Sequence, residues 1–120
     1  MPRMAAPAFQ IAGRAGSSGG VHILEVTGAI THTTAPAFQE AVSAAGAASG
    51  LILDLSEVPS VDSMAIGALV RAYVFCNKAG RKLVLVGVNH RVANVLRLTG
   101  VDSLFDTYAS TRDAEAALLA

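Results

Sequence analysis

Short apolar runs alternate along this chain with stretches whose apolar residues recur at helical spacing. Residues 8–14 and 21–27 are apolar runs separated by Gly and Ser residues that tolerate positive φ angles, and they predict a β-hairpin. Residues 51–55 and 82–88 are apolar without polar alternation, which is typical of strands covered on both faces. A shorter strand is expected at about residues 104–108.

Helical spacing of apolar residues predicts four helices. One lies between the hairpin and the next strand, and one follows each of the three later strands. The expected helices are residues 36–47, residues 63–79, a helix capped by Asn89 and a last helix capped by Ser110. Thr33 or Thr34 can cap the first helix, and Gly80 and Gly100 are expected to end the second and the third.

The resulting order, ββαβαβαβα, predicts the fold class. Strands that alternate with helices after an opening hairpin indicate an α/β fold with a mixed, mostly parallel sheet and right-handed crossovers. We expect one domain over residues 8–120 and a loose N-terminal segment at residues 1–7.

Composition and charge narrow the class of partner. The 120 residues are 52% hydrophobic but only 5% aromatic, so the core is expected to consist of Val, Leu, Ile and Ala. Nine basic and nine acidic residues balance, and neither sign clusters along the chain. This pattern gives no electrostatic footprint for nucleic acid or for a charged membrane surface, and it favours a protein partner.

The single cysteine and the opening residues predict a cytoplasmic protein. Cys76 excludes an internal disulfide and lies in an apolar helical pattern, so we interpret it as a buried thiol that acts as a small hydrophobe. Residues 1–10 lack a continuous apolar segment, so neither a signal peptide nor a membrane anchor is expected. No run reaches the ~18 apolar residues that a membrane-spanning helix needs.

Motifs typical of enzymes and metal sites are absent from the sequence. His22, His32 and His90 do not have the spacing of metal ligands, so no metal is expected. The chain has no Gly-x-Ser-x-Gly elbow, no Walker loop and no Gly-x-Gly-x-x-Gly motif. We therefore expect neither catalysis nor a cofactor.

The junction between loop and second helix, Asp62 and Ser63, is the candidate site. A helix start carries unpaired backbone N–H groups and about half a positive charge, so it stabilises an anion. One interpretation is structural: Asp62 caps the helix and Ser63 occupies its first position. The other is that Ser63 receives a phosphate, and the two interpretations are compatible.

The second helix also predicts an exposed face. If one set of apolar residues faces the sheet, two large apolar residues, Met64 and Phe75, lie on the opposite side of the helix. The predicted inner residues are Ile66, Leu69, Val70, Tyr73 and Val74, and the predicted outer ones are Met64, Ala68, Arg71, Phe75 and Lys78. The outer set is either a partner-binding patch or an ordinary surface. Ser60 in the preceding loop, and Thr31, His32 and Thr33 in the neighbouring turn, serve turn formation and capping or contact a partner.

Three segments of the chain resemble the STAS family, the domain of bacterial anti-sigma factor antagonists and of the cytoplasmic tails of sulfate transporters. They are VTGAITHTTAPAF, LILDLSEVPSVDS and LRLTGVDSLFDTY, and the similarity extends in order over about residues 8–118. The resemblance implies that Ser63 is the serine that an anti-sigma factor, itself a kinase, phosphorylates. Unphosphorylated, such a protein binds the anti-sigma factor; phosphorylated, it dissociates.

Two departures from the family pattern keep an alternative open. Met64 and Ala65 stand where the antagonists usually have Ser or Thr followed by Gly, and Thr31 stands where they have an acidic residue. These residues favour a non-phosphorylated scaffold, either a subunit of a signalling assembly or an accessory subunit of a lipid transporter. A third hypothesis is small-molecule binding in the crevice at the strand ends.

Our leading hypothesis is an anti-sigma factor antagonist-like regulator whose partner is a serine-kinase anti-sigma factor. The sequence leaves the identity of the partner and the oligomeric state open. The predicted partner-binding residues are Thr31, His32, Thr33, Ser60, Asp62, Ser63, Met64, Ala68, Arg71 and Phe75.

Overall fold

The computed structural model describes residues 8–16, 20–45 and 49–119. The strands are β1 (Gln10–Ala15), β2 (Val21–Thr27), β3 (Gly50–Glu57), β4 (Lys82–Val86) and β5 (Asp106–Tyr108). The helices are α1 (Ala35–Ala44), α2 (Ser63–Lys78), α3 (His90–Leu98) and α4 (Thr111–Leu119), with a short 3-10 helix η1 (Asp102–Leu104) before β5. The predicted loose segment 1–7, the hairpin residues 17–19 and the predicted end of the first helix at 46–47 lie outside the described residues.

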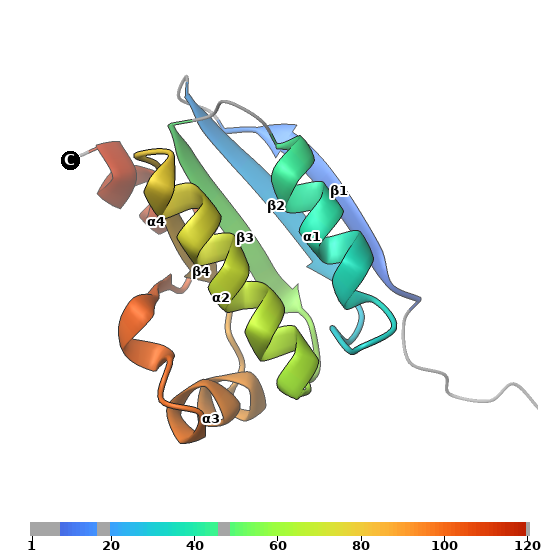
Figure 1. The fold of residues 1–120 in the computed structure, drawn as a ribbon. Helices are drawn as coiled ribbons and strands as arrows, with labels where there is room; N and C mark the ends of the chain where they lie inside the picture. The colour runs from blue at the N-terminus through green and yellow to red at the C-terminus, as the bar shows by residue number, and fades with distance from the viewer. Residues whose placement is uncertain (1–7, 17–19, 46–48, 120) are drawn as a thin grey trace, which may run out of the picture.

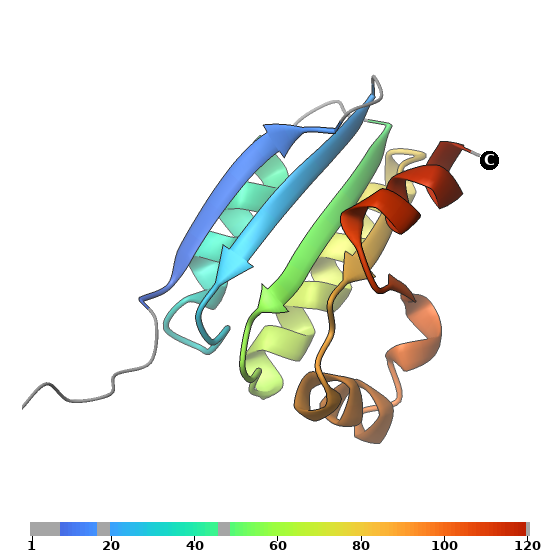
Figure 2. The ribbon, with the colours of Figure 1, turned by 180° about the vertical axis from the view of Figure 1, so that it is seen from behind.

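The strands form one mixed sheet in the order β1-β2-β3-β4-β5. β1 pairs with β2 antiparallel, while β2, β3, β4 and β5 are parallel. Helices α1 and α2 cover one face of this sheet, α4 covers part of the other face, and α3 lies beyond the carboxyl end of β4 (Figures 1 and 2). The predicted α/β class and the order ββαβαβαβα are confirmed.

The main core lies between the sheet and helices α1 and α2, and a smaller one lies under α4. Phe38 of α1 and Leu69 of α2 pack in the main core with Leu53 of β3, and all three are fully buried. Ile52, the neighbour of Leu53, packs with Ala114 of α4 on the opposite face. Because β3 is covered on both faces, its consecutive residues Leu51, Ile52 and Leu53 are all apolar and buried, as expected from the apolar run in the sequence.

Helix α2 differs in phase from the prediction. Ala68, predicted on the outer side, is fully buried, whereas Val74, predicted to face the sheet, is 42% exposed. The buried residues of α2 are Ala65, Ile66, Ala68, Leu69, Ala72 and Cys76. α2 packs against α1 as well as against the sheet, and its small alanines face these neighbours. Apolar residues surround most of this helix, so the pattern alone did not identify its inner stripe.

Cys76 belongs to this buried stripe and is 1% exposed. Burial raises the pKa of its thiol, and the positive charge of Arg81 opposes that effect. Cys76 thus packs as a small apolar residue, as predicted from the helical pattern.

The ends of several elements also differ slightly from the predictions. β4 ends at Val86 and not at residue 88, because Gly87 adopts a left-handed φ of 71°. The segment before β5 forms η1, so the last strand is shorter than expected. No helix in the described part of the chain is long and apolar enough to cross a membrane.

Candidate functional site

The candidate site lies where the loops after β2 and β3 run side by side. Ile30 and Val61 form an isolated parallel bridge beyond the ends of the two strands. The Ile30 N–H donates to the Ser60 carbonyl (3.2 Å), and the Asp62 N–H donates to the Ile30 carbonyl (3.3 Å). These bonds prolong the β2–β3 pairing into the loops. They bring the predicted turn around Thr31 next to the start of α2.

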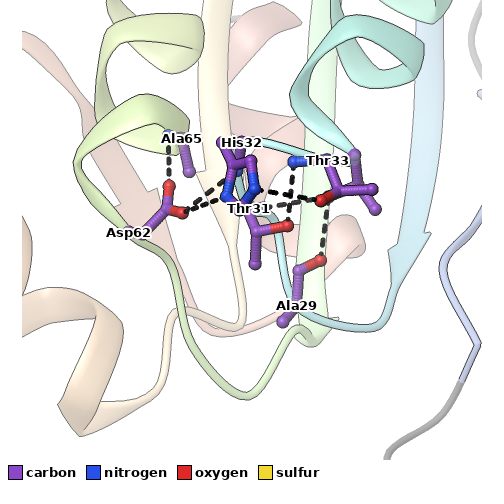
Figure 3. A network of polar contacts seen from close by, with 7 residues as sticks. Ala29, Thr31, His32, Thr33, Asp62 and Ala65 are labelled. Carbon is purple, nitrogen blue, oxygen red and sulfur yellow. Dashed lines mark hydrogen bonds and ion pairs between the residues drawn. The ribbon is translucent and has the colours of Figure 1, made fainter.

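Asp62 caps α2 and also binds the neighbouring loop. Its Oδ1 accepts a hydrogen bond from the Ala65 N–H at 2.9 Å, and its Oδ2 accepts one from the His32 N–H at 3.0 Å (Figure 3). Its backbone is extended, with φ −105° and ψ −176°, as expected of a residue that precedes a helix. The sequence predicted the cap, but not the bond to His32.

These bonds act on the acidity of the carboxyl group. The hydrogen bond from Ala65 is the largest influence, and it lowers the pKa of Asp62. Partial burial opposes it, while the backbone N–H groups of His32 and Met64 and the charge on the His32 ring lower the pKa further. Asp62 is therefore an anion at neutral pH.

The turn that faces Asp62 is held by its own threonines. The Thr34 hydroxyl donates to the Ala29 carbonyl at 3.0 Å and accepts from the Thr31 N–H at 2.9 Å. The Thr31 hydroxyl accepts from the Thr33 N–H at 3.2 Å. Thr34 occupies the N-cap position of α1 but makes no side-chain capping bond, so the prediction of a threonine cap is wrong in that respect. Its hydroxyl closes the turn instead.

His32 stands at the exposed edge of this turn. Its side chain is 75% exposed, and its Nδ1 lies 3.8 Å from Asp62 Oδ2. Its Nε2 lies 3.4 Å from the Thr33 hydroxyl. The imidazole thus joins the two loops at the surface.

Ser63 and Met64 begin α2 directly after the cap. Both are exposed, and Met64 is 53% exposed. In the described part of the chain, no side-chain hydrogen bond involves the Ser63 hydroxyl. An exposed hydroxyl at the start of a helix, beside a fixed carboxylate, is accessible for modification or for contact with a protein.

The structure leaves most of the predicted partner-binding residues accessible and buries one of them. Thr31, His32 and Thr33 lie beside Asp62 (Figure 3), and Ser60 is half-buried in the adjoining loop. Arg71 and Phe75 are exposed further along α2. Ala68 is fully buried and is not available to a partner, which corrects the prediction.

Two hollows lie outside this site, and for neither did the sequence predict the lining residues. One is a groove of about 420 Å³ between α1 and α2, to which Gln39 and Val42 of α1 contribute. The other is a cavity of about 580 Å³ at the carboxyl ends of β4 and β5, lined in part by Arg97 and Tyr108. The groove joins two separate helices, whereas the cavity is lined by residues 87–109 alone. Only the general rule that crevices form at strand ends pointed toward the second.

Comparison with known proteins agrees with this structure. The family model described as the STAS domain matches residues 14–114. The anti-sigma-B factor antagonist of Listeria monocytogenes is 31% identical over 83 residues, which are 68% of this chain and 73% of that protein.

Two solved structures are similar over most of this chain. An anti-sigma factor antagonist from Mycobacterium paratuberculosis has a TM-score of 0.83 and 28% identity, over 98% of this chain and 100% of that one. The murine anion transporter Slc26a9 has a TM-score of 0.79 and 26% identity, over 88% of this chain but only 19% of the transporter. The match to the family model covers most of the chain, and the relatives agree with it, so this chain belongs to the STAS domain family.

Proposed function

We propose that this protein is an anti-sigma factor antagonist that binds a partner protein through the surface around Asp62 and Ser63. The observation that carries the proposal is the exposed Ser63 hydroxyl, placed beside a carboxylate that is fixed to both loops. The Listeria relative, whose name is anti-sigma-B factor antagonist, supports the same class of function. Met64, Arg71 and Phe75 extend this surface along α2.

Phosphorylation of Ser63 would switch this surface. A phosphate adds about two negative charges, and Asp62 already holds one next to it. Within an interface, this concentration of charge brings repulsion and the free energy required for desolvation. A loss of ~3 kcal/mol lowers affinity about a hundredfold. The partner that fits this cycle is an anti-sigma factor with serine-kinase activity.

Mapping of the phosphate tests the switch. The protein is incubated with ATP, Mg²⁺ and its cognate kinase, and the modified peptide is identified by mass spectrometry. We expect a single phosphate on Ser63. Ser63→Ala should remove it, whereas Ser60→Ala, in the same loop, should not. Absence of phosphate from Ser63 under conditions in which the kinase modifies a known substrate would refute the switch.

A second function is a scaffold that is not phosphorylated. Thr31, Met64 and Ala65 differ from the usual antagonist pattern, and the same fold forms part of the chain of an anion transporter. Such a scaffold would be a subunit of a signalling assembly or an accessory subunit of a transporter. A pull-down with Ser63→Asp distinguishes the scaffold from the phosphate-switched antagonist. Unchanged partner binding favours the scaffold, and lost binding favours the switch.

A further inference from the structure

The groove between α1 and α2 lies away from the Asp62 cap and is mainly apolar. Val42 of α1 and Val70, Val74 and Phe75 of α2 line it. Gln39 Nε2 of α1 donates to the Ala68 carbonyl of α2 at 2.8 Å, which ties the two helices together. The groove therefore has walls on two helices that are linked to each other.

Large apolar side chains gather on the outer side of α2. In the described part of the chain, the exposed large apolar residues are Met64, Val74, Phe75, Leu98 and Leu104. The first three belong to α2, and Val74 and Phe75 are 42% and 43% exposed. The spacing of Met64, Arg71 and Phe75 places them along one side of the helix. This gathering distinguishes the α2 surface from scattered exposed residues.

The charged residues that line the groove are both positive. Arg71 and Lys78 line it, and Arg81 Cζ lies 5.9 Å from the centre of the Phe75 ring. α2 carries no acidic residue, and the acidic residue of α1, Glu40, is not among the lining residues. The whole chain has a net charge of zero, so this positive rim is a local feature. It complements an acidic partner.

We propose that this groove binds an amphipathic helix of a partner protein, with an apolar ridge flanked by Asp and Glu residues. The apolar ridge would pack on Val70, Val74 and Phe75, and the acidic flanks would meet Arg71 and Lys78. From Val70 to Lys78 the groove extends for about 12 Å of helix rise, so two to three turns of the partner fill it.

This inference deepens the proposed function and rests on it for the existence of a protein partner. Val70 lies about 10 Å of helix rise from Ser63, so one partner protein can contact both surfaces. The groove does not require Ser63 to be phosphorylated. Binding at the groove and switching at Ser63 are therefore separable by experiment.

Two synthetic peptides provide the probe. Both have leucines at helical spacing on one face; one carries glutamates beside them and the other carries lysines in the same positions. Each peptide is titrated into the unphosphorylated, isotope-labelled full chain, and the amide shifts are followed by NMR. We expect the glutamate peptide to bind at least tenfold more tightly and to shift the residues of α1 and α2 that line the groove.

Matched variants test the two parts of the groove. Phe75→Ser should weaken binding of the glutamate peptide at least tenfold, whereas Leu98→Ser, at an exposed leucine of α3, should not. Arg71→Glu combined with Lys78→Glu should reverse the preference between the peptides, whereas Arg97→Glu should leave it unchanged. The amide spectrum of each variant establishes that it is folded.

Several outcomes would overturn the proposal. They are equal binding of the two peptides, no binding of either, or shifts confined to the cavity beside Arg97. Self-association of the chain that Phe75→Ser abolishes would also overturn it, because the groove would then bind a second copy. None of these results bears on whether a kinase modifies Ser63, so failure here leaves the test of the proposed function intact.

Discussion

The Asp62 carboxylate accepts a hydrogen bond from the backbone N–H of His32, 30 residues earlier in the chain, at 3.0 Å. Its other oxygen caps α2 through Ala65. One side chain therefore fixes the start of the helix and the loop beside it, and Ser63 follows directly. The position of Ser63 at the surface depends on this double contact.

Replacement of Asp62 should test that contact. Asp62→Ala removes both hydrogen bonds, and we expect a loss of about 1–2 kcal/mol in the free energy of unfolding. Asp62→Asn keeps one oxygen that can cap α2, so its loss should be smaller. Denaturant unfolding followed by circular dichroism measures both. Equal stability of Asp62→Ala and the wild type would contradict the role assigned to the cap.

The lowered pKa of Asp62 predicts a pH dependence of stability. A carboxyl group with a lower pKa in the folded than in the unfolded chain stabilises the fold fully above its unfolded pKa, about 3.9. That stabilisation disappears as the pH falls through the folded pKa. We expect the wild type to lose more free energy of unfolding than Asp62→Asn between about pH 5 and pH 2. Parallel pH profiles of the two proteins would show that Asp62 does not contribute.

A negative charge at Ser63 should affect binding and leave the fold intact. The helix start favours an anion by about 0.3–1 kcal/mol, which offsets repulsion from Asp62, so Ser63→Asp is expected to remain folded. If the protein is a phosphate-switched antagonist, this variant should bind its partner about a hundredfold more weakly. Ser63→Ala should bind as the wild type does. Titration calorimetry with the purified partner measures the difference.

Gly87 and Gly80 offer a matched pair of positions with left-handed backbone. Their φ angles are 71° and 73°, but a Cβ at Gly87 would lie 2.6 Å from Ser56 Cβ, whereas at Gly80 nothing lies within 4 Å. Gly80→Ala should destabilise the fold by about 1–2 kcal/mol through backbone strain alone. Gly87→Ala should lose about 1–3 kcal/mol more, because its neighbour includes backbone atoms. Thermal unfolding of both variants checks the difference, and equal losses would contradict the steric argument.

The buried position of Ala68 can be tested with a larger side chain. Ala68→Leu should overpack the space between α2 and its neighbours and reduce the free energy of unfolding by about 1–3 kcal/mol. Val74→Leu on the exposed side of the same helix should change it by less than about 0.5 kcal/mol. A larger loss for Val74→Leu than for Ala68→Leu would favour the helix phase that the sequence predicted, and equal losses would contradict the burial of Ala68.

Most features that depend on neighbouring residues were predicted correctly, with the threonine cap of α1 as the exception. Asp62 and Asn89 cap their helices through bonds to residues three positions later, and Ser110 accepts a bond from the Asp113 N–H. Gly80 and Gly100 end helices with positive φ. Each of these signals involves a few consecutive residues, so the sequence contains all the information needed.

Helix α2 was harder to predict, because apolar residues occupy most of its circumference. The choice of Ala68 over Val74 for the interior depends on contact with two neighbours, the sheet and α1. The periodicity of apolar residues along a helix indicates the side that faces one neighbour, such as the sheet. It does not indicate where a second neighbour, such as α1, packs at an angle to the first. The groove beside α1 was missed for the same reason.

The sequence by itself determined the order of elements, the caps that begin α2 and α3, and the position of Ser63 directly after a capping aspartate, because each follows from local hydrogen bonding and apolar periodicity. Only the tertiary structure decided what surrounds Ser63. It joined His32 to Asp62 through a parallel bridge between Ile30 and Val61, closed the turn with Thr34, and exposed Val74 and Phe75 beside α1. Such contacts join segments distant in the chain and depend on how the sheet aligns them, which no local pattern specifies.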